Sequence, residues 1–279
     1  MEISGALTDA FVYYLTVIVV CEGARHVADH LFDKNGNIHR FLIEFLGTLQ
    51  ITTTVYENAV IDIYYGRQAF AFTLFSTGLI FALCNRTAFC NPLAPIERFI
   101  FGKLRFGEFI CTLAAQLSAG YFAFSFAKTI WLRAYSTTEA HSRMLRSMES
   151  CRFNHPYPIY YHLAFELIGT FVVRHVLTRA TSGARDSRVR FVFPALFMAA
   201  VFTGTVTFLG DQALDPMVAS TLFLGCRGLT FENFMLIYWI APTVGWMASA
   251  FVDSQGEESA KRRAAKERKA EKKQAKKNN

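Results

Sequence analysis

The chain has 279 residues, of which 52% are hydrophobic, 15% aromatic and only 18% charged. A soluble domain carries about a quarter charged residues, so this composition indicates a membrane protein. The net charge of +7 does not indicate a nucleic-acid surface, because residues 253–279 alone hold ten Lys or Arg and five Asp or Glu. A nucleic-acid-binding domain spreads its basic groups over a folded face. The apolar content also excludes a disordered chain, and six cysteines are too few for a disulfide scaffold.

Seven stretches are apolar and close to the length of about 20 residues that a bilayer crossing needs. The predicted spans are 7–24, 41–61, 69–83, 109–131, 159–177, 191–209 and 234–252. The first stretch is not a signal peptide, because Glu2 and Asp9 stand where a basic region is required and no small-residue cleavage site follows. We therefore expect it to be retained as a helix.

Lys and Arg side chains gather in the loops after the first, third and fifth predicted spans. The positive-inside rule places these loops and the C-terminus in the cytosol, and the N-terminus across the membrane. The loop at 133–152 is an exception, since its four arginines fall on the far side. The sequon Asn85-Arg86-Thr87 lies on the cytosolic side in this topology, so we expect it to carry no glycan.

Two halves of the chain repeat the same landmarks. Glu44 and Glu166 each begin an E-x-x-G-T sequence, and an Asn-Pro or Asp-Pro pair follows 47 and 49 residues later, at Asn91 and Asp215. Three spans per copy force the two copies into opposite orientations, which is the inverted-repeat plan of many transport proteins.

Each pair precedes an apolar stretch that is too short to cross a bilayer, at 96–101 and 218–225. Asn and Asp are good N-caps, and Pro is tolerated in the first turn of a helix. Each stretch could simply be an ordinary loop helix, but the matched positions favour two half-helices that enter the membrane from opposite sides. Their positive N-terminal ends would repel cations, while the caps bind a neutral solute through hydrogen bonds.

These features together resemble the aquaporin, or major intrinsic protein, family over residues 41–252. The resemblance is carried by the E-x-x-G-T openings, the sequence Tyr-Trp-Ile-Ala-Pro at 238–242, and the paired boxes Asn91-Pro92-Leu93 and Asp215-Pro216-Met217. The chain is most similar to the unorthodox branch called superaquaporins. The first box in that branch departs from Asn-Pro-Ala, and a cysteine follows the start of the second box by eleven residues, here Cys226.

The resemblance implies an all-α membrane protein that contains an inverted repeat of two three-span units, two re-entrant half-helices and an extra N-terminal helix. We expect three regions: 1–40, a channel core at 41–252 with repeats 41–132 and 158–252, and a Lys-rich cytosolic tail at 253–279. It further implies that Glu44 and Glu166 brace the re-entrant loops. The family also implies a homotetramer in the lipid bilayer with one pore per subunit, no cofactor and no catalytic residue.

Departures from the family pattern alter the expected pore. Leu93 and Met217 replace alanines that help the half-helices to pack, and Asp215 replaces an amide with a carboxylate, which only accepts hydrogen bonds when ionised. Val218 stands where orthodox members place an arginine filter. We expect a wider, more apolar pore that passes water, with glycerol and hydrogen peroxide as further candidate solutes. A scaffold of the same fold with a closed pore is the alternative.

The sequence gives less support to a protease or a metal site. Asp211 and Asp215 lack the G-x-G-D pattern of an intramembrane aspartyl protease, so Asp211 is interpreted as a solvated loop residue. His26 and His30 share a helix face, but no third metal ligand is identifiable from spacing. Cys151 and Cys226 fall on the same non-cytosolic side, which permits a disulfide without establishing one. Lysines third and fourth from the C-terminus match the dilysine signal for return to the endoplasmic reticulum.

Overall fold

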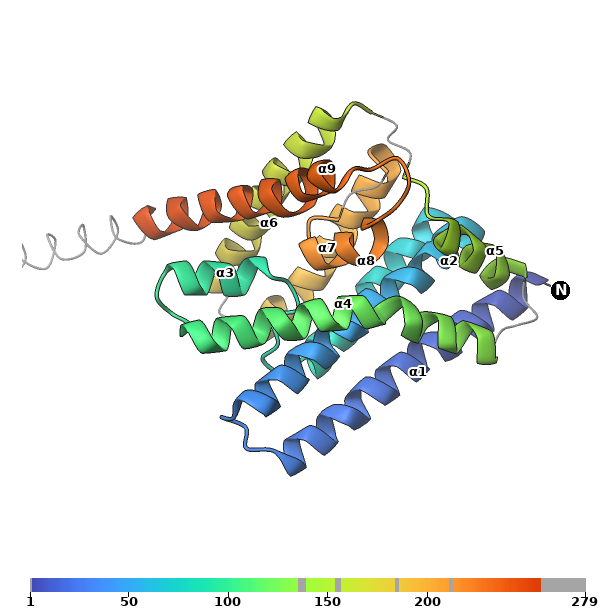
Figure 1. Cartoon of the computed structure of the whole chain (residues 1–279), viewed down its shortest axis with the longest axis horizontal. Helices are drawn as coiled ribbons and strands as arrows, with labels where there is room; N and C mark the ends of the chain where they lie inside the picture. Colours follow the sequence, from blue (N-terminus) through green and yellow to red (C-terminus); the bar gives the residue numbers. More distant parts are fainter. Residues whose placement is uncertain (1, 135–138, 154–156, 184–185, 211–212, 257–279) are drawn as a thin grey trace, which may run out of the picture.

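A computed structural model describes residues 2–134, 139–153, 157–183, 186–210 and 213–256 of the chain. The regular secondary structure within these ranges is helical, which confirms the predicted all-α class (Figure 1). The elements are α1 (Glu2–Leu31), α2 (Asn37–Cys84), α3 (Leu93–Ile100), α4 (Phe106–Ala134), α5 (Glu139–Ser150), α6 (Ile159–Gly183), α7 (Ser187–Phe208), α8 (Pro216–Phe223), α9 (Phe231–Met235) and the π-helix η1 (Leu236–Ile240).

Five helices are long and apolar enough to cross a membrane: Leu7–Leu31, Asn37–Cys84, Phe106–Leu132, Arg188–Phe208 and Phe231–Gly256. The second of these, α2, has 48 residues, more than twice the length of one crossing. It is interrupted at Gly66, whose φ of 77° and ψ of 178° are not helical. A backbone with this positive φ favours glycine. The predicted spans 41–61 and 69–83 are thus the two halves of one broken element.

The structure differs from the sequence prediction in several helices. The stretch predicted as span 159–177 lies in α6, which is long enough to cross but buries the polar side chains of His162, Glu166 and Arg174. The helix α5 was not predicted, because it is amphipathic and a search for apolar stretches passes over it. The π-helix η1 lies just before Pro242, where the missing proline N–H already disturbs regular α-helical bonding.

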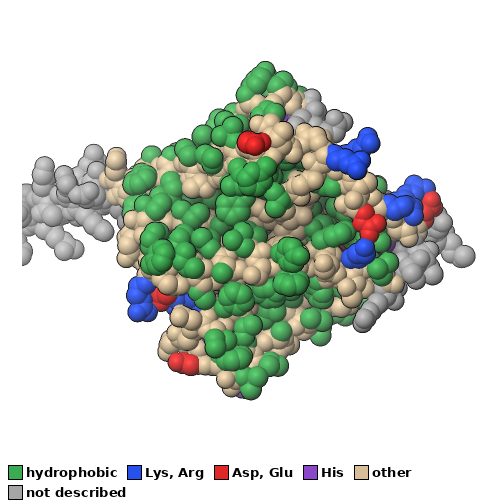
Figure 2. Space-filling view, viewed as in Figure 1, with side chains coloured by type: hydrophobic (Ala, Val, Ile, Leu, Met, Phe, Trp, Pro, Cys, Tyr) green, Lys and Arg blue, Asp and Glu red, His purple; other side chains and the backbone are tan. Residues whose placement is uncertain are grey.

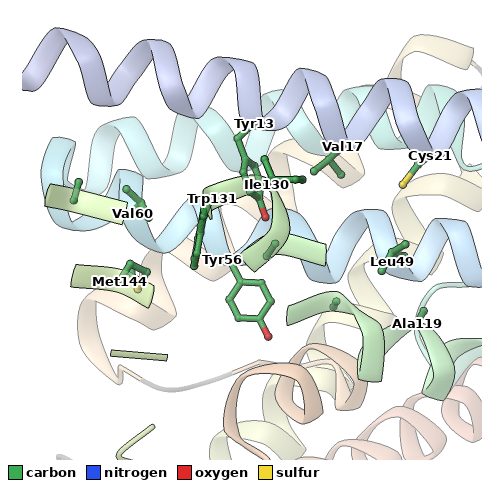
Figure 3. Close-up of a cluster of buried hydrophobic side chains, with 13 residues drawn as sticks. Tyr13, Val17, Cys21, Leu49, Tyr56, Val60, Ala119, Ile130, Trp131 and Met144 are labelled. Atoms are coloured by element: carbon green, nitrogen blue, oxygen red, sulfur yellow. The ribbon is translucent and has the colours of Figure 1, made fainter. Parts of the chain in front are cut away.

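The extra N-terminal helix α1 packs along the first half of α2 and also contacts α4. Figure 3 shows Tyr13 and Val17 of α1 beside Ile130 and Trp131 of α4, with Tyr56 of α2 next to them. All five side chains are at most 7% exposed. This cluster gives α1 a fixed place at the edge of the bundle (Figure 1).

The outer surface is apolar, in keeping with a lipid environment. Phe11, Phe72, Leu83 and Tyr121 are each at least 67% exposed. Figure 2 shows hydrophobic side chains over the middle of the visible face, while the charged side chains lie toward its ends. Exposed apolar surface of this extent marks a membrane or protein contact rather than a face in water.

A close helix crossing supplies a test of the fold. Gly245 lies where the last membrane-length helix, Phe231–Gly256, meets α6. A Cβ at this position would overlap the carbonyl oxygen of Leu167 and lie 2.6 Å from Thr170 Oγ1. We expect Gly245→Ala to lower the free energy of unfolding by about 1–3 kcal/mol, the usual cost of overpacking. The measurement is the melting temperature of the purified protein in detergent.

Gly204→Ala is the matched control, because a Cβ at Gly204 in α7 would meet nothing within 4 Å. Alanine is the better helix former, so this variant should melt at the same temperature or higher. Equal melting temperatures for the two variants would contradict the close crossing.

Candidate functional site

A buried carboxylate holds the loop before the first half-helix. Glu44 of α2 is 3% exposed and accepts hydrogen bonds from the backbone N–H groups of Phe89 (2.9 Å) and Cys90 (2.6 Å). It also accepts a bond of 2.7 Å from Gln116 Nε2 of α4. These bonds satisfy loop donors that have no helical partner, which is required wherever backbone is removed from water.

Glu166 of α6 makes the equivalent contacts in the other half of the chain. This fully buried side chain accepts hydrogen bonds from the N–H groups of Ala213 (2.8 Å) and Leu214 (3.0 Å). Leu214 and Cys90 have positive φ values of 50° and 57°, in the left-handed region that costs a non-glycine residue about 1–2 kcal/mol. Each strained residue directly precedes a box, so each glutamate helps to hold the turn that presents the box.

Both boxes begin a short helix. Asn91 Oδ1 accepts a hydrogen bond of 2.9 Å from the N–H of Leu93, and Asp215 Oδ1 accepts one of 2.7 Å from the N–H of Met217. The helices α3 and α8 have eight residues each, or about 12 Å, which is too short to cross a bilayer. They begin before the predicted stretches 96–101 and 218–225, because the box residues themselves form the first turn.

The box residues divide into two groups. Asn91, Asp215 and Val218 line one cavity of roughly 1140 Å³. The third positions are packed away from it: Leu93 is fully buried and Met217 is 1% exposed. Met217 lies against Gly120 of α4, where a Cβ would come within 2.6 Å of its terminal methyl group.

The sequence analysis missed a polar stripe along α2. Gln50, Thr54, Asn58 and Asp62 all line the cavity, and their four-residue spacing puts them on one helix face. Asp62 is paired with Arg67. The spacing was visible in the sequence and could have identified the stripe. Other parts of the wall are apolar, including Phe70 and Leu74 from α2 and Phe202 and Val206 from α7.

A disulfide lies in the wall of the cavity. Cys151 follows α5, Cys226 follows α8, and the two form a disulfide whose cysteines both line the cavity. Beside the disulfide, the N–H of Phe153 donates a backbone hydrogen bond of 2.8 Å to the carbonyl of Arg227. The disulfide that the sequence left open is therefore present, and it fixes the segment after α5 against the end of α8.

An ionic cluster joins α3, α6 and the last helix. Arg174 donates to Glu97 Oε1 (2.7 Å) and to Asp253 Oδ2 (2.8 Å), and Trp246 Nε1 donates to Glu97 Oε2 (2.6 Å). Trp246 lines the cavity. Asp253 is 6% exposed and lies within the membrane-length helix Phe231–Gly256.

The remaining candidates lie outside this site. Asp211 and the tail from residue 257 fall outside the described residues. His26 lies 3.4 Å from Glu22, and in the described part of the chain no group of three or more His, Cys, Asp or Glu side chains could hold a metal ion.

Two half-helices with their caps at one cavity, inside a bundle of membrane-length helices, define a membrane channel fold. A solved structure agrees: the aquaglyceroporin from Plasmodium falciparum superposes with a TM-score of 0.54 at 17% identity, covering 77% of this chain and 94% of that one. No family model matches the chain.

Proteins with similar sequences show to which family the chain belongs. A Caenorhabditis elegans protein that carries the name aquaporin-10 is 33% identical over 91% of this chain and 89% of its own. Aquaporin-11 of Milnesium tardigradum is 23% identical over 85% of this chain and 83% of its own, and aquaporin-11 of Rattus norvegicus is 22% identical over 75% of each. The chain belongs to the aquaporin family and resembles its aquaporin-11 type. It is a membrane channel protein for water or small solutes, and not an enzyme.

The glutamate contacts lead to a prediction about stability. Glu166→Leu leaves the N–H groups of Ala213 and Leu214 buried without an acceptor, at a cost of about 1–3 kcal/mol for each. We expect a lower melting temperature in detergent and faster hydrogen exchange at these two amides.

The control is Glu232→Leu, which replaces an exposed glutamate in the first turn of α9 and should change neither quantity. If Glu166→Leu leaves exchange at residues 213 and 214 unchanged, the glutamate does not hold the loop.

Proposed function

We propose that the chain is a passive channel for water and for small neutral solutes such as glycerol and hydrogen peroxide. The pore would be formed by the two half-helices that Asn91-Pro92 and Asp215-Pro216 begin. The observation that carries the proposal is the single cavity that both caps, Asn91 and Asp215, line. The polar stripe of α2 offers hydrogen bonds along this cavity, and its apolar wall suits the carbon backbone of a small polyol.

The missing arginine favours a broad solute range. Val218 lines the cavity at the position that the family resemblance assigns to the filter, so no fixed cation narrows the passage there. Arginine at such a position adds a donor and a barrier to cations. An aliphatic side chain provides neither, which supports a wider pore than a strict water filter.

The alternative is a scaffold of the same fold that conducts poorly. The large side chains of Leu93 and Met217 support this alternative, because both are buried in the first turn of a half-helix. For either role we propose residence in the endoplasmic reticulum with a cytosolic C-terminus, supported by the lysines at 276 and 277. The inverted repeat, the superaquaporin branch and a homotetramer are also proposed. The matched contacts of Glu44 and Glu166 support the repeat.

Flux through purified protein in liposomes tests the proposal. We expect osmotic shrinkage in stopped-flow light scattering to be several-fold faster than in empty liposomes, with measurable uptake of glycerol and peroxide. The control is Glu232→Gln, which should retain water flux because this exposed residue is not among those that line the cavity. Shrinkage at the rate of empty vesicles would instead support the scaffold.

The carboxylate at Asp215 predicts a weaker barrier to cations than an amide would give. Each helix N-terminus carries about half a positive charge, so an ionised Asp215 offsets roughly the sum of the two ends. We expect Asp215→Asn to lower the proton leak of liposomes loaded with a pH-sensitive dye, while water flux is retained. Glu232→Gln, at an exposed residue that does not line the cavity, should leave the leak unchanged. Equal leaks in wild type and Asp215→Asn would contradict this electrostatic argument.

A further inference from the structure

Two polar side chains of the extra helix α1 contact residues of α2 that line the cavity. The Tyr14 hydroxyl donates a hydrogen bond of 2.6 Å to Asn58 Oδ1, and Arg25 donates one of 2.7 Å to Gln50 Oε1. Both acceptors belong to the polar stripe of α2 that lines the cavity. Each contact therefore connects a helix outside the repeated core to a side chain on the proposed solute path.

Arg25 is held in a defined position. It is completely buried within a membrane-length helix, where a guanidinium is costly unless it is paired. Besides Gln50, it donates to Glu22 Oε2 of its own helix (3.1 Å) and to the carbonyl oxygen of Leu46 (3.2 Å). A donor fixed by three acceptors can in turn fix the side chain that it contacts.

These contacts set the orientation of both amides. A guanidinium can only donate, so it binds the oxygen of Gln50 and leaves the NH₂ group to other partners. The Tyr14 hydroxyl donates to the oxygen of Asn58, and this contact leaves the NH₂ group of Asn58 to other partners as well. Neither amide nitrogen has a hydrogen-bond partner among the described residues, and neither is enclosed away from open space. Each side chain is 3% exposed and lines the cavity, so its NH₂ group is left for a solute.

We propose that α1 makes Gln50 and Asn58 fixed hydrogen-bond donors for solute oxygen atoms, with Tyr14 and Arg25 as positioning residues. The two amides are eight residues apart on α2, or about 12 Å along the helix axis. The inference rests on the proposed channel function and names its solute class: small neutral molecules with several oxygen acceptors, polyols above all. Water makes fewer simultaneous contacts and depends less on these donors.

The neighbouring tyrosine supplies a matched control. Tyr13 also donates a hydrogen bond to α2, of 2.9 Å, but its acceptor is the backbone carbonyl of Thr53, which is not among the residues lining the cavity. Figure 3 shows Tyr13 within the packed cluster of α1 and α4. Tyr13→Phe thus removes a hydroxyl from the same helix without releasing an amide on the path.

The experiment compares glycerol and water permeability of full-length protein in liposomes. We expect Tyr14→Phe to lower the ratio of glycerol to water permeability by about two- to tenfold, the effect of one net hydrogen bond. Tyr13→Phe should leave this ratio at the wild-type value. A general loss of folded channel would reduce both permeabilities together and leave the ratio unchanged, so the ratio separates positioning from stability.

A double-mutant cycle tests whether Tyr14 acts through Asn58. Asn58→Leu alone should lower the ratio, and adding Tyr14→Phe should lower it no further. Gln50→Met gives a second measurement at the other amide, independent of whether a variant at the buried Arg25 folds. Equal ratios in wild type, Tyr14→Phe and Gln50→Met would overturn the inference. So would additive effects of Tyr14→Phe and Asn58→Leu. Wild-type flux at the level of empty liposomes would overturn the channel function itself, which is a different result.

Discussion

The structure of the cavity depends on two carboxylates that replace water as hydrogen-bond partners. Irregular backbone at membrane depth survives only where its polar groups find acceptors or donors in the protein. Glu44 and Glu166 provide acceptors for the loop N–H groups next to the strained residues Cys90 and Leu214. If these contacts were absent, the loop N–H groups beside both caps would be buried without an acceptor.

The two halves share this bracing but present different chemistry to the cavity. In each half a cap oxygen accepts from the first turn of the half-helix. Asn91 then still has an NH₂ group, whereas an ionised Asp215 has only a second oxygen. With Asp215 ionised, the Asn91 cap offers the cavity a hydrogen-bond donor and the Asp215 cap offers an acceptor, and a hydroxyl group can satisfy both. The polar stripe of α2 adds the amide groups of Gln50 and Asn58 to the cavity wall.

The sequence predicted the parts of this arrangement that recur along the chain. Glu44, Glu166 and the two boxes were found because their spacing repeats, and the helical class followed from apolar length. The contacts of α1 could not be found in this way. Tyr14 and Asn58 are 44 residues apart, and only the packing of α1 on α2 brings them together. The stripe from Gln50 to Asp62 was readable, but its polar residues lay inside a span that was judged by hydrophobicity.

The first loop is braced from a second side, and this gives α1 a structural reason to carry charge. Arg86, with a positive φ of 56°, donates to Glu22 (2.9 Å) and Asp29 (2.8 Å) of α1. The loop is therefore tied to α1 at Arg86 and to α2 at Cys90, four residues further along. A helix that served only as a membrane anchor would need none of these ionic groups, which are costly in an apolar span. The placement of charge on α1 follows the loop and the cavity, and this makes the helix part of the channel rather than an appendage to it.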